Sequence, residues 1–179
     1  MVDRLNYGVG RIIMFGIFAM MAVLLWSTIS KFSDQPSLWT LEVAQFAMIA
    51  YFFLGGPYAI QMGSHVRMDL FYENWSVRRK AAVDVVTVLC LITYLIVLLW
   101  GGLSSTAYSL GHFGSNPIGF FADVATGEKS IGILERSRTI WRPHLWPIKT
   151  LMCVGILLML LQALSELCKD IFRLRGEEV

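Results

Sequence analysis

"IIMFGIFAMMAVLLWSTIS", residues 12–30, is a stretch without a single charged side chain. A helix needs about 20 mostly apolar residues to cross the ~30 Å hydrocarbon layer of a membrane. Each backbone N–H and C=O group in that layer must find its hydrogen bond within the protein, which a helix provides. The stretch therefore predicts a transmembrane helix. We do not expect its removal as a signal peptide, because the apolar run is long and no small-residue cleavage site follows it.

Three further apolar runs repeat this pattern. Residues 43–62 are uncharged, and residues 87–109 belong to a longer uncharged run. Residues 150–165 are also uncharged, and the helix that contains them is longer if it begins at Pro147. The chain has 179 residues, of which 56% are hydrophobic and 16% are charged, and its mean hydropathy is +0.60. It is far more apolar than a typical soluble domain. The sequence thus predicts an all-α membrane protein that forms one domain over residues 1–179. Its four transmembrane helices are expected at about 11–31, 40–62, 80–110 and 147–170.

Lysine and arginine are distributed unevenly between the two sides of this predicted domain. The side that carries both termini has the larger share, and the side richer in these residues usually faces the cytoplasm. We therefore expect cytoplasmic termini and a long outer loop at 111–146. The terminal side carries Arg4, Arg11, Arg67, Arg78, Arg79, Lys80, Lys169, Arg173 and Arg175, and the other side carries Lys31, Lys129, Arg136, Arg138, Arg142 and Lys149.

Tryptophan residues indicate the same topology. Indole rings prefer the head-group level of a membrane, where the ring is buried and its N–H group is hydrated. We expect all six to be interface anchors. Trp26, Trp39, Trp100, Trp141 and Trp146 fall near the predicted outer helix ends, and Trp75 falls in the inner loop.

Glycine and proline mark a weak point in the second predicted helix. Gly55 and Gly56 lack side chains and Pro57 lacks a backbone N–H, so we expect a bend at this triplet. An alternative is a broken helix that lines a transport site, but that architecture usually includes a matching break in another helix, and the sequence shows none. Small residues also permit helices to approach closely. The candidates are Gly16, Gly55, Gly56, Gly101 and Gly102.

Two shorter helices are expected outside the spans. Gly63 and Ser64 are typical of a helix end followed by a new helix start, which predicts a short interfacial helix at 65–75. Its apolar residues fall on two faces, so we expect one face on lipid and one on a protein partner. The outer loop is expected to contain a short helix at about 129–139. The third transmembrane helix is longer than a membrane requires and should tilt or project beyond it.

Intramembrane charges, which transporters and pumps use for ion coupling, are missing from this chain. A charged group inside a membrane is costly and is usually kept only for a function. No Asp, Glu, Lys, Arg or His falls in the middle of the four predicted helices. Glu42, Lys149 and Glu166 lie near helix ends, where side chains can reach the interface.

Enzymatic and cofactor chemistry also finds little support. A bound haem needs two histidines at matched depth, but His65 is predicted inside and His112 and His144 outside. His65 and Asp69 are spaced to pair with each other on a helix, and Ser64 is better used as a cap than as a nucleophile. We therefore expect no catalytic residue, metal or cofactor. Cys90, Cys153 and Cys168 are interpreted as packing residues.

The basic cluster before the third helix points to lipid. Arg78, Arg79 and Lys80 fall at a predicted membrane boundary, where anionic lipid head groups are the expected partners rather than nucleic acid.

Two segments resemble a known family. The chain has the four spans of the DctQ-like small membrane subunit of TRAP (tripartite ATP-independent periplasmic) transporters. Its stretch "GSHVRMDLFYENWSVRRK", residues 63–80, resembles the loop after the second span of that subunit. His65, Arg67 and Asp69 match the family's motif there, followed by the basic cluster. The stretch "WRPHLWPIKTLMCVGILLMLLQAL", residues 141–164, is similar to the family's lead into its last span, with Trp146, Pro147 and Gly155 as the matching positions.

The resemblance implies a function that fits the missing intramembrane charges. In such a system a periplasmic substrate-binding protein delivers an organic acid, and a large DctM-like permease subunit in the bacterial inner membrane carries the substrate and sodium sites. The small subunit is a non-catalytic scaffold, in which His65, Arg67 and Asp69 would fix the inner-loop helix by capping and pairing. The long outer loop departs from the family pattern and resembles that of the branch named for mannitol or chloroaromatic compounds. The resemblance therefore does not identify the substrate of this system. The alternative is a self-contained, homo-oligomeric membrane transporter or a redox membrane anchor.

Overall fold

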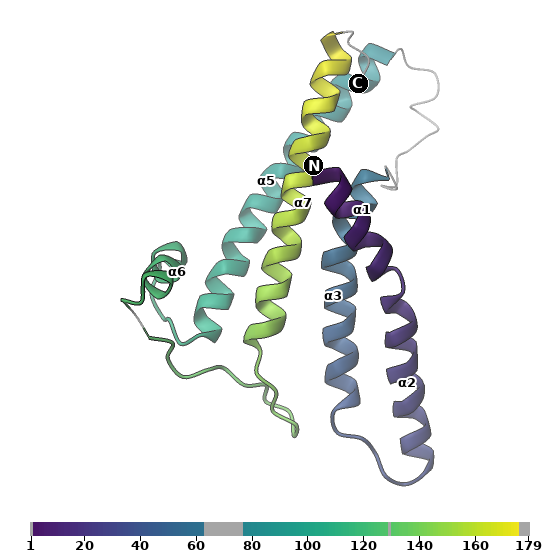
Figure 1. Cartoon of the computed structure of the whole chain (residues 1–179), viewed down its shortest axis with the longest axis vertical. Coiled ribbons are helices and arrows are strands. Elements are labelled where there is room, and N and C mark those ends of the chain that lie inside the picture. Colours follow the sequence, from purple (N-terminus) through teal and green to yellow (C-terminus); the bar gives the residue numbers. More distant parts are fainter. Residues whose placement is uncertain (1, 63–76, 129, 176–179) are drawn as a thin grey trace.

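The computed structural model describes residues 2–62, 77–128 and 130–175, with side chains over 2–62, 83–128 and 130–172. The predicted all-α fold with four membrane-spanning helices is confirmed in these ranges. Figure 1 shows the long helices running along the long axis of the molecule, with a short helix in the connection beside them. The helices are α1 (Val2–Ile13), α2 (Gly16–Phe32), α3 (Thr40–Gln61), α5 (Val77–Ser109), α6 (Pro117–Thr126) and α7 (Trp146–Arg175).

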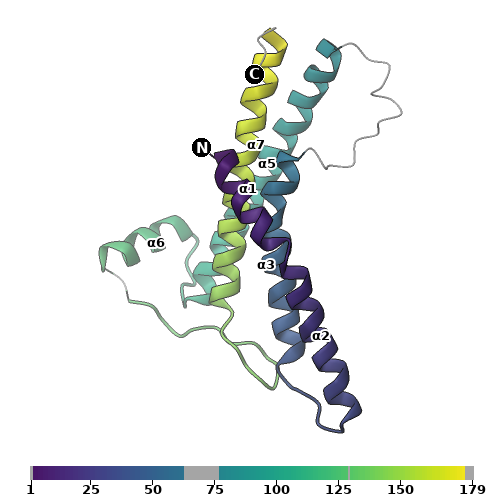
Figure 2. The ribbon, with the colours of Figure 1, turned by 45° about the vertical axis from the view of Figure 1, so that its right-hand side comes forward.

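The four spans follow the apolar runs of the sequence closely. The apolar helical segments are Val2–Phe32, Thr40–Gln61, Val83–Ser109 and Trp146–Phe172. We call the end of the bundle where α3 ends the terminal side, and the end where α2 ends the loop side. Helix α5 has 33 residues and α7 has 30, which correspond to about 50 and 45 Å. Both exceed the ~30 Å hydrocarbon layer, and Figures 1 and 2 show both extending past α1 at the terminal side.

The helix break of this fold lies in the first span. Helix α1 ends at Ile13 and α2 begins at Gly16, and the turn between them is tightened by a 3.2 Å bond from the Phe15 N–H to the Ile12 carbonyl. We expected one continuous helix here. A glycine after an aromatic residue is tolerated both inside a helix and at its start, so the sequence pattern did not locate the break.

The Gly55-Gly56-Pro57 triplet lies inside α3, which continues through it from Thr40 to Gln61. It therefore does not divide α3 into two helices. Pro57 is buried, and a Cβ atom added to Gly56 would lie 2.5 Å from the Met159 sulfur of α7. This contact favours the packing interpretation of the triplet, and the bend stays a prediction.

Helix α7 lies at the centre of the packing, since it contacts α1, α3 and α5. The buried side chains of Leu95, Ile156 and Ala163 form the core between α5 and α7. Against α3, a Cβ atom added to Gly155 would lie 2.7 Å from the backbone oxygen of Phe53. Glycine thus brings α3 and α7 within backbone contact, as small residues do in membrane helix pairs.

Other glycines differ in the contacts they permit. A Cβ on Gly10 of α1 would overlap Tyr58 of α3 at 2.3 Å, and a Cβ on Gly102 of α5 would lie 3.1 Å from the Cys153 sulfur of α7. Gly101, in contrast, has no atom within 4 Å of its added Cβ. Gly102 therefore takes part in a close helix contact within this chain, whereas Gly101 leaves its surface open, and the role of these glycines in assembly stays a prediction.

The loop-side connection contains α6, which replaces the helix expected at 129–139. Asn116 caps α6 by accepting a 3.2 Å bond from the Gly119 N–H, Pro117 occupies the first turn, and Gly127 ends the helix with φ 80°. These are ordinary helix start and stop signals. Residues 130–145 form no helix and instead bond to the end of α5, so the predicted helix position is wrong.

Candidate functional site

A polar network joins α1 to α7 on the terminal side. Asn6 Nδ2 donates to Gln162 Oε1 at 2.7 Å, and Gln162 Nε2 donates to Asp3 Oδ1 at 2.8 Å. Lys169 forms ion pairs with Asp3 at 3.1 Å and with Glu166 at 2.8 Å. Residues three or four apart share a helix face, so each helix contributes one polar face. The network therefore fixes the position of α1 along α7.

The amide pair at the centre of this network is fully enclosed. Asn6 is 1% exposed and Gln162 is 0% exposed, whereas the Lys169 and Asp3 side chains are 28% and 38% exposed. Ion pairs this open to solvent contribute little to stability. A buried amide that loses its partner costs about 1–3 kcal/mol. The amide pair, rather than the ion pairs, is therefore the main polar interaction that holds α1 against α7.

Asn6 and Gln162 were not singled out in the sequence analysis. One signal was available, since Gln162 is the only amide in the apolar run of the fourth span. Polar side chains in such runs commonly bond across helices. The sequence pattern did not identify which helix Gln162 would meet.

A second network encloses a carboxylate on the loop side. Glu42, in the first turn of α3, is only 4% exposed, and its Oε1 accepts a 3.1 Å bond from the Ser137 hydroxyl. Its Oε2 is buried and has no hydrogen-bond partner among the residues that the structure describes. Glu42 lies near a helix end, as the sequence placed it, and the loop covers its side chain. The positive end of the α3 dipole favours a carboxylate at this position.

The same loop is also attached to α5 and α7. Lys149 Nζ of α7 lies 2.6 Å from Glu135 Oε2 and donates a 3.3 Å bond to the Ser105 carbonyl of α5. The backbone N–H of Glu135 donates to the Ser109 carbonyl at 3.0 Å. The loop thereby connects the loop-side ends of α3, α5 and α7.

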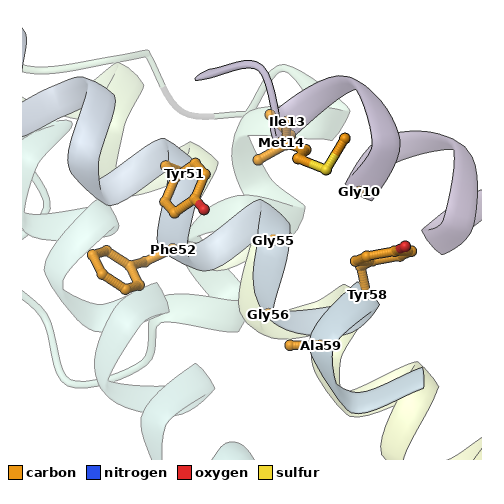
Figure 3. A pocket seen from close by; sticks show the side chains of 9 residues that line it. All are labelled: Gly10, Ile13, Met14, Tyr51, Phe52, Gly55, Gly56, Tyr58 and Ala59. Atoms are coloured by element: carbon orange, nitrogen blue, oxygen red, sulfur yellow. The ribbon is translucent and has the colours of Figure 1, made fainter. Parts of the chain in front are cut away.

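An apolar cavity opens where the first span breaks. It has a volume of about 320 Å³ and lies between α3 and the α1–α2 junction (Figure 3). Its lining residues are Gly10, Ile13, Met14, Tyr51, Phe52, Gly55, Gly56, Tyr58 and Ala59. Another apolar cavity, of about 310 Å³, lies between α5, α6 and α7.

The predicted interface anchors are exposed wherever the structure describes them. Trp26 in α2 is 55% exposed and Trp100 in α5 is 50% exposed. The other described tryptophans, Trp39, Trp141 and Trp146, are also exposed and lie at or near the loop-side helix ends. Their role as membrane anchors stays a prediction.

Several predicted residues lie where the structure gives no side chains. The interfacial helix at 65–75, with His65, Arg67, Asp69 and Trp75, falls outside the described residues. The basic residues Arg78, Arg79 and Lys80 belong to the start of α5, and their side chains are likewise outside the described set.

The described histidines and cysteines take separate positions. His112 stacks on Phe120 with ring centroids 4.6 Å apart, and His144 forms an isolated backbone bridge with Arg136. Cys153 is buried against α5, as expected of a packing residue, but Cys90 and Cys168 are exposed. In the described ranges no three His, Cys, Asp or Glu side chains lie close enough together to hold a metal ion.

Comparison with known proteins identifies the family. A family model described as "Tripartite ATP-independent periplasmic transporters, DctQ component" matches residues 20–173. The match includes the α3–α7 crossing and the loop-side network, and it begins within α2, after the helix break. No curated protein and no solved structure matches the chain significantly. Because the matched segment covers most of the chain, the protein belongs to the DctQ family and is a membrane component of a TRAP transporter.

Proposed function

We propose that this chain is the non-catalytic scaffold of its transporter, bound to a large DctM-like permease subunit. The large subunit would carry out sodium-driven uptake of an organic acid, which a periplasmic substrate-binding protein delivers. On this proposal the complex lies in the bacterial inner membrane, and both termini of the chain are cytoplasmic.

The placement of charge is the observation that supports this proposal most directly. In the described residues, the charged side chains of α3, α5 and α7 lie near the helix ends, and α2 carries only Lys31, in its last turn. Those with visible partners fasten helices and loop together, as Lys149 and Lys169 do. A carrier would need polar or ionisable groups at mid-membrane depth to bind its substrate and ions. This arrangement supports a role as the rigid scaffold of the transporter rather than as its moving carrier.

Exposed apolar surface is the second support. In the most apolar window of the first span, no residue is buried against the rest of the described chain. Helix α2 contacts α3 along one side and α1 at the break, and it leaves side chains such as Phe18, Leu25 and Trp26 exposed. A scaffold would offer such a surface to its large partner and to lipid.

Reconstitution tests the proposal. We expect proteoliposomes that contain this chain, the large subunit and the binding protein to accumulate a carboxylate substrate when a sodium gradient is imposed. Vesicles with this chain alone should show no uptake above empty vesicles, because the chain offers no mid-membrane site. Uptake by the chain alone, with each member of a mono- and dicarboxylate panel tested, would contradict the scaffold role and favour the self-contained transporter.

The motif residues are proposed to act in assembly. We expect Asp69→Ala to reduce the amount of large subunit that co-purifies with this chain several-fold, since Asp69 would pair with His65 and hold the interfacial helix. Substrate preference of the remaining complex should not change. Glu128→Ala, which removes an exposed carboxylate from the outer loop, is the control. Normal assembly together with an altered substrate preference would show that Asp69 acts at the substrate instead.

A further inference from the structure

We propose that the cavity at the break of the first span binds one anionic phospholipid. One acyl chain would occupy the cavity, and Arg4 and Arg11 of α1 would hold the phosphate. This inference depends on the chain lying in a membrane and not on its role in transport.

The cavity exists because glycines leave space between α1 and α3. Gly10 and Gly56 are covered by Tyr58 and Met159, but a Cβ on Gly55 would meet only Ile13, at 3.8 Å. Figure 3 shows the glycines of α3 between the rings of Tyr51 and Tyr58, with the side chains of Ile13 and Met14 across from them. The lining is almost entirely apolar, and its volume of about 320 Å³ falls in the range of small-ligand sites.

The depth of the cavity matches one leaflet of a membrane. The lining residues of α3 run from Tyr51 to Ala59, two residues before the helix ends at Gln61. The eight helical steps from Tyr51 to Ala59 span about 12 Å, and half of a ~30 Å hydrocarbon layer is about 15 Å. An acyl chain that entered from the terminal side would therefore lie against the cavity over most of its leaflet.

The charge at the cavity mouth suits a phosphate group. Arg4, Tyr7 and Arg11 lie at i, i+3 and i+7, so they share one stripe of α1, and Met14 follows three residues after Arg11, just beyond the end of the helix. Met14 lines the cavity, and the Tyr7 ring lies 5.8 Å from that of Tyr58. The two arginines on this stripe thus flank the cavity, whose α1 lining is Gly10 and Ile13.

Both arginines are available to a ligand. They are exposed, and no residue that the structure describes forms an ion pair with either of them. The acidic residue beside them, Asp3, bonds to Gln162 and Lys169 of α7, so its charge is already paired. Arginine binds phosphate oxygens in bidentate fashion. An apolar cavity flanked by two arginines that have no ion-pair partner in the described ranges is complementary to an anionic phospholipid. An apolar side chain of a protein partner would leave these charges unmatched.

Native mass spectrometry of the delipidated chain tests the proposal with phosphatidylglycerol and phosphatidylcholine as probes. We expect one retained phosphatidylglycerol and much weaker retention of phosphatidylcholine. Arg4→Gln and Arg11→Gln should each weaken phosphatidylglycerol binding about fivefold, the usual effect of one cation near an anionic lipid surface. Lys31→Gln, which removes an exposed cation at the opposite end of the same span, should leave binding unchanged.

Filling the cavity provides the apolar counterpart. Gly55→Leu should abolish the retained lipid, because the new side chain would occupy the acyl position. Gly101→Leu, at a helix glycine with open space around it, is the matched control and should bind lipid normally. Equal phosphatidylglycerol binding by Gly55→Leu, Gly101→Leu and the arginine variants would overturn the proposal.

A photo-crosslinker distinguishes lipid from protein without relying on a destabilising variant. Phe52 lines the cavity and is 64% exposed, so Phe52→p-benzoylphenylalanine places the reactive group at its wall. In intact membranes that contain the whole complex, we expect a phospholipid adduct on this chain. A crosslink to another protein chain instead would assign the cavity to a protein partner and overturn the proposal.

Discussion

Gly155→Ala is expected to lower the free energy of unfolding by about 1–3 kcal/mol, the usual cost of overpacking. The added Cβ would lie 2.7 Å from both the Cβ and the backbone oxygen of Phe53. A backbone atom cannot rotate out of the way, so α3 and α7 must separate. Their separation would also loosen the contact between Gly56 and Met159, which lies one turn further along both helices. Denaturant titration of the purified protein in mild detergent, followed by circular dichroism, measures the change.

Gly101→Ala is the matched control for this substitution. It adds the same methyl group to a glycine inside a membrane-spanning helix, where no atom lies within 4 Å. Alanine favours helix over glycine by up to about 1 kcal/mol, so we expect unchanged or slightly higher stability. If Gly155→Ala and Gly101→Ala behaved alike, the backbone contact between α3 and α7 would be wrong.

Gln162→Leu is expected to release α1 from the bundle and to cost about 1–3 kcal/mol of stability. The substitution would leave the buried side chain of Asn6 without its partner and remove the donor to Asp3. An unpaired buried amide is more costly than a pair replaced on both sides. Hydrogen exchange over residues 2–13 should accelerate more than exchange in α3, because α1 loses its polar fastening.

A double-mutant cycle with Asn6→Leu separates pairing from simple loss of polarity. The double variant should be less destabilised than the sum of the single ones, with a coupling energy of about 0.5–2 kcal/mol. Gln45→Leu removes an exposed glutamine from α3 and should have little effect. Additive single effects would show that Asn6 and Gln162 do not depend on each other.

The spans were predictable because their cause is local. Each of the four runs has the length and apolarity that a membrane requires, whatever the rest of the chain does. The predicted segments at 40–62 and 147–170 agree with Thr40–Gln61 and Trp146–Phe172 within a few residues. The family resemblance had the same basis, because it combined four spans with short motifs, and the family match bears it out.

Features that depend on two segments at once were missed. The break before Gly16 and the burial of Glu42 were not predicted, and the outer-loop helix was placed at the wrong residues. The break leaves a cavity where α1 meets α3, and Glu42 is buried by a loop nearly one hundred positions later in the chain.

The sequence by itself therefore determined that this protein is a four-span membrane protein of a recognisable family, with its charges near the helix ends. Only the tertiary structure decided which helices meet, how the amides of Asn6 and Gln162 pair across 156 positions, and where a lipid could enter. The physical reason is that apolar side chains gain little by exchanging lipid for another helix. Hydrophobicity specifies that a helix enters the membrane, whereas glycine contacts and a few buried polar groups select its neighbours.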